Sequence, residues 1–114
     1  MDFIKELENT KTNMANYGAE CPEGAGGFMA MKDAMMQPGE LSFKQKELIA
    51  LAIGIVRQCA DCIAYHIQAS IEAGATKKEV AETVSVAIMM GGGPAFMYGA
   101  RAMEAYDQFK AAKG

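Results

Sequence analysis

The residues best suited to chemistry are gathered in one short segment, Cys59-Ala-Asp-Cys62-Ile-Ala-Tyr-His66, which contains the only histidine of the chain. On a helix that turns by about 100° per residue, Cys59, Cys62 and His66 share one face. Residues three apart on a helix lie roughly 5 Å apart, within the ~4.4–6.8 Å range of α-carbon separations in disulfides. The two cysteines can therefore close and reopen a disulfide without refolding of the chain.

Two physical arguments disagree about which thiol is the more reactive. If a helix begins near Cys59, its unpaired N–H groups and its dipole favour a thiolate at the helix start, which is Cys59. Helical side chains lean toward the N-terminus, so the imidazole of His66 is expected to lie over Cys62. The position of the histidine favours Cys62 and the helix start favours Cys59, so these two arguments alone leave the choice open.

Glu47, twelve positions before Cys59, has two interpretations. It lies in a stripe of Leu, Ile and Ala, where a carboxylate is costly unless it is paired or shares a proton. In that case it can orient His66 or pass protons through a water molecule. It also follows Lys44 and Lys46, and it fits equally well as a solvated surface residue.

The elements that must position these residues are predicted to be helices, because apolar residues recur at helical spacing and no long run of strict alternation indicates a strand. Ser42-Phe-Lys-Gln45 and Thr76-Lys-Lys-Glu79 fit capping boxes, which mark helix starts. We therefore predict an all-α single domain over residues 1–114, a bundle of about six helices. Their expected ranges are 3–17, 26–36, 42–57, 59–73, 77–90 and 94–110.

Glycine and proline mark the expected breaks between these helices. The loop Gly18-Ala-Glu-Cys21-Pro22 should end the first helix, and Gly24-Ala-Gly-Gly27 should be a flexible connection. Gly74 is the expected left-handed terminator of the fourth helix. Gly91-Gly-Gly-Pro94 should separate the last two helices, with Pro94 at the first helical position. The pattern leaves open whether Arg57-Gln58 interrupts a helix.

The composition excludes several classes of protein. A chain of 114 residues with 51% hydrophobic and 22% charged residues is too apolar for a disordered chain and too charged for a membrane bundle. A net charge of −3 with scattered Lys and Arg offers no basic face to nucleic acid. We see no secretion signal and no apolar run long enough to span a membrane, so we expect a cytoplasmic protein. Three cysteines are too few for a secreted disulfide scaffold.

Glu47, eleven intervening residues and then Cys-x2-Cys-x3-His form a pattern of four residues at fixed spacing. Over about residues 41–109 the chain resembles the alkylhydroperoxidase D-like core of the carboxymuconolactone decarboxylase family. The resemblance implies that Cys62 attacks a peroxide, that Cys59 resolves the intermediate as a disulfide, and that His66 and Glu47 relay protons. It also implies an all-helical homo-oligomer, often a trimer or hexamer.

A thiol peroxidase or disulfide oxidoreductase of this kind takes a hydroperoxide or a disulfide as substrate and a small thiol or thiol protein as reductant, with no cofactor. One position departs from the family pattern, because well-studied alkylhydroperoxidase D proteins carry a histidine immediately before the second cysteine and this chain has Asp61. An acidic neighbour raises the pKa of a thiol, which favours general disulfide reduction over efficient peroxide reduction. The lactone decarboxylases generally lack the cysteine pair, so their reaction is not expected.

Two other functions fit the same residues. Cys59, Cys62 and His66 offer three ligands for zinc or iron, and Cys21 can complete four. Structural zinc sites, however, usually place their cysteine pair on a turn and not in an apolar helix. The second alternative is a non-redox binding or assembly protein in which both cysteines are buried hydrophobes. Cys21 is otherwise expected to be an incidental thiol.

The chain also has more apolar surface than one small core can enclose. Its ten methionines are predicted to fill adaptable core and interface positions. The helix expected over 77–90 carries small or apolar residues around most of its circumference, which indicates close helix contacts on more than one side. A closed symmetric assembly of identical chains is the simplest way to bury the excess.

Overall fold

The computed structural model describes residues 1–113, which form six helices and no strand. They are α1 (Phe3–Glu20), α2 (Pro22–Met35), α3 (Phe43–Val56), α4 (Ala60–Glu72), α5 (Lys77–Gly91) and α6 (Gly93–Lys113). The predicted all-α class is confirmed. Within residues 1–113 none of the helices has the combined length and apolarity that crossing a membrane requires.

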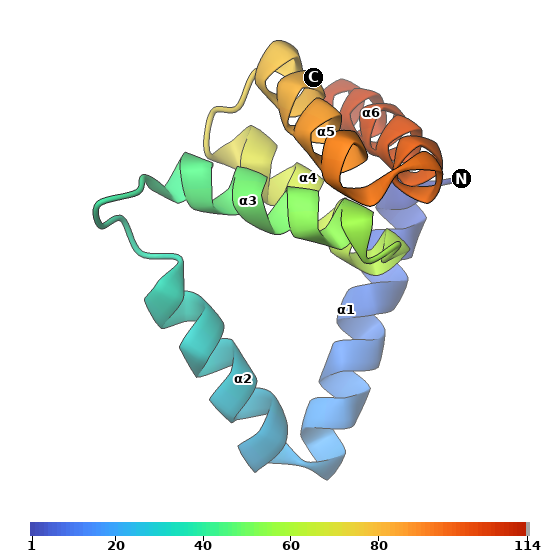
Figure 1. Cartoon of the computed structure of the whole chain (residues 1–114). Coiled ribbons are helices and arrows are strands. Elements are labelled where there is room, and N and C mark those ends of the chain that lie inside the picture. Colours follow the sequence, from blue (N-terminus) through green and yellow to red (C-terminus); the bar gives the residue numbers. More distant parts are fainter. Residues whose placement is uncertain (114) are drawn as a thin grey trace.

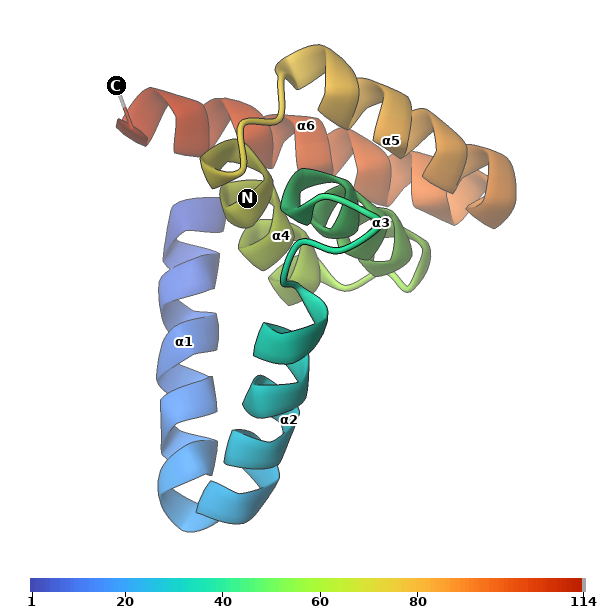
Figure 2. The same cartoon turned by 90° about the vertical axis from the view of Figure 1, so that its left-hand side faces the viewer.

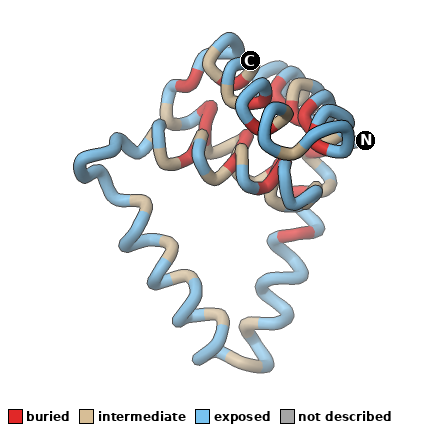
Figure 3. Tube along the Cα trace, in the orientation of Figure 1, coloured by how far each residue is buried: buried red, intermediate tan, exposed pale blue. Residues whose placement is uncertain are grey.

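The molecule has two parts, which we call the body and the arm. The body consists of α3 to α6 and residues 3–10 of α1, and the arm is residues 11–35, the rest of α1 together with α2 (Figures 1 and 2). Figure 3 shows that the buried positions lie in the body and that α2 has none. The largest fully buried apolar side chains of the core are Phe3, Leu51, Ile55, Ile63, Ile67 and Val80.

Three hydrogen bonds attach the start of α1 to α6. The backbone N–H of Phe3 donates to Gln108 Oε1 at 2.7 Å, and Gln108 Nε2 donates to the carbonyl of Met1 at 2.7 Å. The terminal ammonium of Met1 pairs with Glu104 at 2.9 Å. These contacts fix the beginning of the long helix from which the arm extends.

Both predicted capping boxes are present. The backbone N–H of Gln45 donates to Ser42 Oγ at 3.0 Å, and the N–H of Ser42 donates to Gln45 Oε1 at 2.8 Å. Thr76 and Glu79 make the same reciprocal pair at 3.1 and 2.9 Å. The caps satisfy N–H groups that have no partner within the helix, and so they fix the starts of α3 and α5.

Two predictions about the arm are wrong. The first helix does not end at Tyr17 but continues to Glu20, and only Cys21 separates it from α2. The N–H of Cys21 still donates to the carbonyl of Tyr17 at 2.9 Å, and Pro22 occupies the first turn of α2, where its missing N–H costs nothing. The glycines from Gly24 to Gly27 are therefore helical and do not form a flexible connection.

In the body the breaks are close to their predicted places. Arg57 and Gln58 do interrupt the chain of helices, with Gln58 in the left-handed region at φ 57°. Gly74 has φ 90°, as its predicted role of terminator requires. Gly92 alone, at φ 75°, separates α5 from α6, so α6 begins at Gly93, one residue earlier than predicted, and Pro94 is not its first residue.

Candidate active site

The two cysteines of the motif form a disulfide at the start of α4. Their α-carbons are 5.2 Å apart. Cys59 is the N-cap residue, and its sulfur accepts a hydrogen bond from the backbone N–H of Cys62 at 3.1 Å. Both sulfurs thus lie where free N–H groups and the positive end of the helix dipole stabilise negative charge. The predicted pairing geometry and the predicted helix start are both present.

Glu47 and His66 form a hydrogen-bonded pair between α3 and α4. Glu47 Oε1 lies 2.7 Å from His66 Nδ1, and Glu47 is only 3% exposed. Of the two interpretations of Glu47, the paired and buried one is therefore correct. An ionised carboxylate only accepts hydrogen bonds, so with Glu47 ionised Nδ1 carries the ring proton. Nε2 is then the nitrogen that exchanges protons with other groups.

Gly54 brings the two helices of this pair close together. A Cβ built on Gly54 would lie 3.0 Å from the Cβ of Cys62 and 3.8 Å from its carbonyl carbon. A larger residue on α3 would push α4 away at the level of the disulfide. The close approach keeps Glu47, on the same helix as Gly54, within hydrogen-bonding reach of His66.

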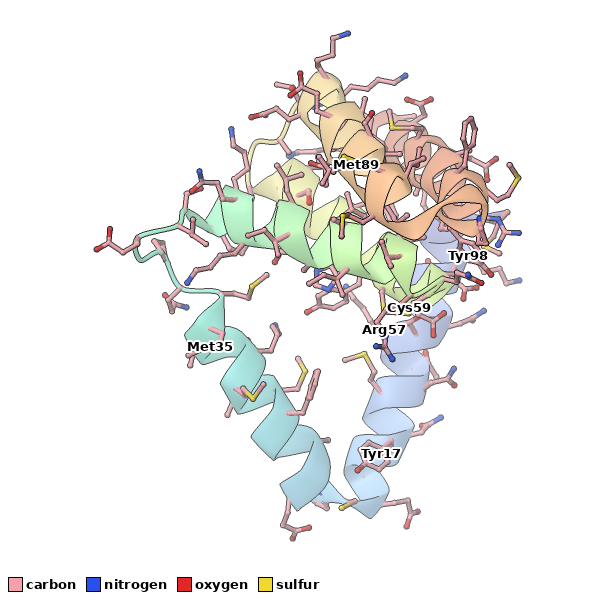
Figure 4. The ribbon with its side chains drawn as sticks, viewed as in Figure 1. Tyr17, Met35, Arg57, Cys59, Met89 and Tyr98 are labelled. Atoms are coloured by element: carbon pink, nitrogen blue, oxygen red, sulfur yellow. A yellow bond between two sulfur atoms is a disulfide. The ribbon has the colours of Figure 1, made fainter. Side chains whose placement is uncertain are left out.

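Two cavities open onto the disulfide and the histidine. We call the larger one the groove; its volume is about 910 Å³, and Cys59, Cys62 and His66 all line it. The second cavity, of about 210 Å³, is lined by Cys62 and His66 but not by Cys59. Figure 4 shows Cys59 and Arg57 at the end of α3, on the side of the body from which the arm projects. Cys62 is therefore accessible from two directions.

Two pairs of charged side chains lie near Cys62. One pair joins α1 to α4, and the other lies on α2. The pKa of Glu6 is raised, first by its hydrogen bond with the side chain of Asp61 and then by burial and by the repulsion between the two groups. Lys32 Nζ lies 2.8 Å from Asp33 and 5.7 Å from the centre of the Tyr65 ring. Hydrogen bonds to Asp33 and Tyr65 raise the pKa of Lys32.

The comparisons with known proteins agree with the predicted resemblance. The model of the carboxymuconolactone decarboxylase family matches residues 22–105, a range that includes Glu47, both cysteines and His66. The chain belongs to the carboxymuconolactone decarboxylase family. A crystal structure of a family protein from Legionella pneumophila, in its apo form, has a TM-score of 0.91 at 39% identity and covers 94% of this chain and 96% of its own.

Three further relatives extend the comparison. A family protein of Thermotoga maritima, for which a part in an antioxidative response has been suggested, has a TM-score of 0.84 at 24% identity and covers 94% of this chain and 92% of its own. An uncharacterized protein of Cupriavidus necator is 34% identical over 96% of this chain and 97% of its own length. One from Haemophilus influenzae is 33% identical over the same shares. The family and the fold are thus shared across nearly the whole chain.

The ligands of the alternative metal site are not grouped in the described part of the chain. Residues 1–113 hold no group of three or more His, Cys, Asp or Glu side chains placed to bind a metal ion. Cys21 lies where α1 meets α2 at the tip of the arm, away from the start of α4 (Figures 1 and 2). The structure therefore does not bring Cys21 to the cysteine pair.

Lys32 and Arg57 line the groove but were not predicted as site residues. Lys32 reaches the site only because α2 returns beside the body, and no pattern in the sequence specifies that return. Arg57 had a usable signal, since it lies two residues before Cys59 in the interruption between two helices.

Proposed function

We propose that this protein is a thiol-dependent oxidoreductase that cycles the Cys59–Cys62 disulfide, with a hydroperoxide or a disulfide as substrate and an external thiol as reductant. The observation that carries the proposal is the disulfide at the N-terminus of α4 in a cavity shared with His66. The part-buried hydrogen bond between His66 and Glu47 supports it further. A histidine held by a carboxylate is a suitable proton donor and acceptor beside a thiol.

In the proposed cycle Cys62 is the nucleophile. Its thiolate attacks the distal oxygen of a hydroperoxide, the O–O bond breaks, and His66 supplies a proton to the departing alkoxide, which leaves as an alcohol. The Cys59 thiolate then attacks the sulfenic acid on Cys62, the S–O bond breaks and the disulfide forms. The departing hydroxide takes a proton from His66, which solvent has reprotonated, and leaves as water. With a disulfide substrate, Cys62 forms a mixed disulfide that Cys59 resolves. An external dithiol returns the protein to its reduced form.

The assignment of Cys62 as nucleophile is supported by access and by its neighbours. Cys62 lines both cavities that contain His66, whereas Cys59 lines one. The proposed relay runs from His66 to Glu47, whose carboxylate would hold the ring orientation and stabilise the imidazolium. Glu47 acts through His66 and is a positioning residue.

We also propose that the working unit is a homo-oligomer, a trimer or a hexamer. Large apolar side chains are exposed on two surfaces, on the arm and around the junction of α5 and α6; they are Phe28, Met31, Met35, Val86, Met89, Met90, Phe96 and Met97. Exposed apolar surface of this extent marks an interface. Light scattering at micromolar concentration should give a multiple of the mass of one chain, and a stable monomer would contradict the assembly.

The test of the catalytic proposal uses protein reduced with dithiothreitol and then freed of the reductant. Hydrogen peroxide or oxidised glutathione should consume two thiols per chain, and mass spectrometry should find the Cys59–Cys62 disulfide. Cys62→Ser should lower the rate of thiol consumption by at least ~10³-fold, because the nucleophile is lost. Cys59→Ser should stop at a sulfenic acid or a mixed disulfide on Cys62.

Cys21→Ser is the matched control, because it removes a thiol at the tip of the arm and should leave the rate unchanged. If wild-type thiols react no faster than those of the unfolded chain with either oxidant, the proposal is wrong.

A further inference from the structure

We propose that Lys32 is a further functional residue of this site, and that its ammonium group, carried by α2, stabilises the thiolate of Cys62. Lys32 acts through Cys62 and is a positioning residue, not a catalytic one. The inference rests on the proposed function, because a stabilised thiolate serves the reaction only where Cys62 is the nucleophile.

Lys32 borders both of the cavities that Cys62 lines, and among residues 1–113 it is the only lysine that does so. The smaller cavity, of about 210 Å³, holds only about seven water molecules at their volume in the liquid, so charges on its wall interact over a short distance. The side chain of Lys32 is 28% exposed, and water therefore screens its charge only in part. Cys62 belongs to α4, so its sulfur stays beside both cavities when the disulfide is reduced.

A contact with Tyr65 holds the ammonium group beside α4. Lys32 Nζ lies 5.7 Å from the centre of the Tyr65 ring, and that ring meets the ring of His66 edge-on, with 5.2 Å between their centres. The face of an aromatic ring attracts a cation. Hydrogen bonds to Asp33 and Tyr65 raise the pKa of Lys32, so the ammonium keeps its charge over the range in which thiols titrate.

The ion pair of Lys32 with Asp33 has its positive end toward Cys62. The two charged groups are 2.8 Å apart, and the side chain of Asp33 is 66% exposed. Both residues line a third cavity, of about 610 Å³, which contains Glu47 and neither cysteine. Asp33 lines neither of the cavities that Cys62 lines. Water therefore screens the carboxylate more strongly than the ammonium, and the pair leaves a net positive potential on the side of the thiol.

Two carboxylates near Cys62 act in the opposite direction. Asp61 lines the smaller cavity beside Cys62, and Glu6 on α1 forms a hydrogen bond with the side chain of Asp61. Negative charge on these groups disfavours a thiolate. In the smaller cavity Lys32 is the only Lys or Arg of residues 1–113 that opposes them.

The other cationic groups near Cys62 differ from Lys32 in exposure or in titration. Arg57 lines the groove but not the smaller cavity, and it is exposed. His66 is cationic only when protonated, and it exchanges its proton with Cys62, so the two groups titrate as a coupled pair. Lys32 is thus the permanent cation with the least screening among the groups that share a cavity with Cys62.

The experiment uses the full-length chain with Cys62 as its single thiol. Cys59→Ser removes the disulfide, and serine is a favourable N-cap residue, so the start of α4 is kept. Cys21→Ser removes the thiol at the tip of the arm. The rate of alkylation by iodoacetamide, a neutral reagent, is measured as a function of pH. The midpoint reports the ionisation of the Cys62–His66 pair, and the plateau at high pH reports access to the sulfur.

In this background Lys32→Met should raise the midpoint and leave the plateau unchanged. At a pH below both midpoints alkylation should slow by about fivefold, because the fraction of thiolate falls. A cation disfavours the protonated form of either partner, so the direction is the same whether the thiol or the imidazolium loses the proton. Lys32→Arg keeps the charge and should keep the midpoint. Added salt should reduce the difference between Lys32→Met and the parent protein.

Lys11→Met is the matched control. Lys11 is an exposed lysine of the arm that lines the third cavity and neither of the cavities that Cys62 lines. Its substitution removes the same charge from the same part of the molecule. The midpoint should stay where it is in the parent protein.

Three results would overturn the inference and leave the proposed function intact. They are a midpoint that Lys32→Met does not raise, an equal rise in Lys11→Met, and a rise in Lys32→Arg as large as that in Lys32→Met. A change in the plateau alone is the first of these, and it would show that Lys32 affects access and not charge. If the midpoint rises as expected and neither oxidant oxidises the wild-type thiols, Lys32 stabilises the thiolate and the proposed redox cycle is wrong.

Discussion

The body and the arm are held in place by different forces. In the body, apolar residues from five helices are enclosed, and Leu51, Ile55 and Ile63 are fully buried around the two helices that carry the site. In the arm no residue is buried, and α2 packs on α1 alone among the helices. The C-terminal end of α2 is attached to α3 through Lys46, whose ammonium donates to the carbonyls of Met35 and Gln37 at 2.7 and 2.6 Å.

The difference separates the reacting groups from the surface that faces them. Glu47, His66 and both cysteines belong to the body or to its edge, where the close packing of α3 on α4 fixes their mutual geometry. The arm supplies the opposite wall of the groove and is held by a few contacts. Substitutions in the body should therefore alter chemistry and stability, whereas substitutions in the arm, apart from those of Lys32, should alter access and assembly.

After loss of the Cys62 nucleophile itself, the largest expected effect is that of removing the buried carboxylate of Glu47. Glu47→Ala takes away the group that orients His66, and we expect thiol oxidation in the pre-reduced protein to slow by about 10²-fold, the lower range for general acid–base catalysis. Glu23→Ala removes an exposed carboxylate from the arm and should leave the rate within twofold of wild type. Equal rates for the two variants would show that the Glu47–His66 pair has no part in the reaction.

Packing at α5 and α6 provides the next test. A Cβ on Gly99 would lie 2.6 Å from Cγ1 of Val84, a stiff β-branched side chain in the core. Gly99→Ala should therefore destabilise the protein by about 1–3 kcal/mol, as overpacking of a core does. Thermal unfolding followed by circular dichroism should show a Tm lower by at least ~4 °C. An unchanged Tm would mean that the body is more loosely packed than the structure indicates.

A glycine-to-alanine substitution in the arm should change the stability of the protein in the opposite direction. A Cβ on Gly27 meets no heavy atom within 4 Å, and the residue is in the interior of α2. Gly27→Ala should stabilise the helix by about 0.5–1 kcal/mol, because alanine loses less backbone entropy than glycine. The measurement is Tm together with helical ellipticity. A lower Tm would indicate a contact at Gly27 in the assembled protein.

The body and the arm also differ in how much of their structure could be predicted from the sequence. In the body, apolar spacing and two capping boxes predicted α3 and α5 within one residue at either end. The shared face of Cys59, Cys62 and His66 was also predictable, because helical geometry alone determines it. In the arm the four residues from Gly24 to Gly27 were predicted as a connection, since no buried stripe there indicates a helix.

The partners of the site residues depend on tertiary packing and were harder to predict. The burial of Glu47 could not be decided from sequence, because it depends on how closely α3 approaches α4 at Gly54. The place of Lys32 in the groove wall depends on how α2 lies relative to the body, which the local sequence pattern does not determine.

The smallest expected effect is at a contact within the body, where Glu6 on α1 faces Asp61 on α4. The raised pKa of Glu6 means that the folded protein binds this proton more tightly than the unfolded chain does. The resulting stabilisation is fully present below the ordinary pKa of 4.5 and is lost as the pH rises through the raised pKa. At pH 7 the two carboxylates repel each other.

Glu6→Gln replaces that repulsion by an amide that can donate a hydrogen bond to Asp61. We expect the Tm of this variant to exceed that of wild type by about 1–2 °C at pH 7, a size typical of surface substitutions, and to match it at pH 4. Glu8→Gln, at an exposed position of the same helix, removes the same charge and should show no such dependence on pH. A gain that is equal at both pH values would reflect net charge alone, and the contact between α1 and α4 would then carry no electrostatic cost.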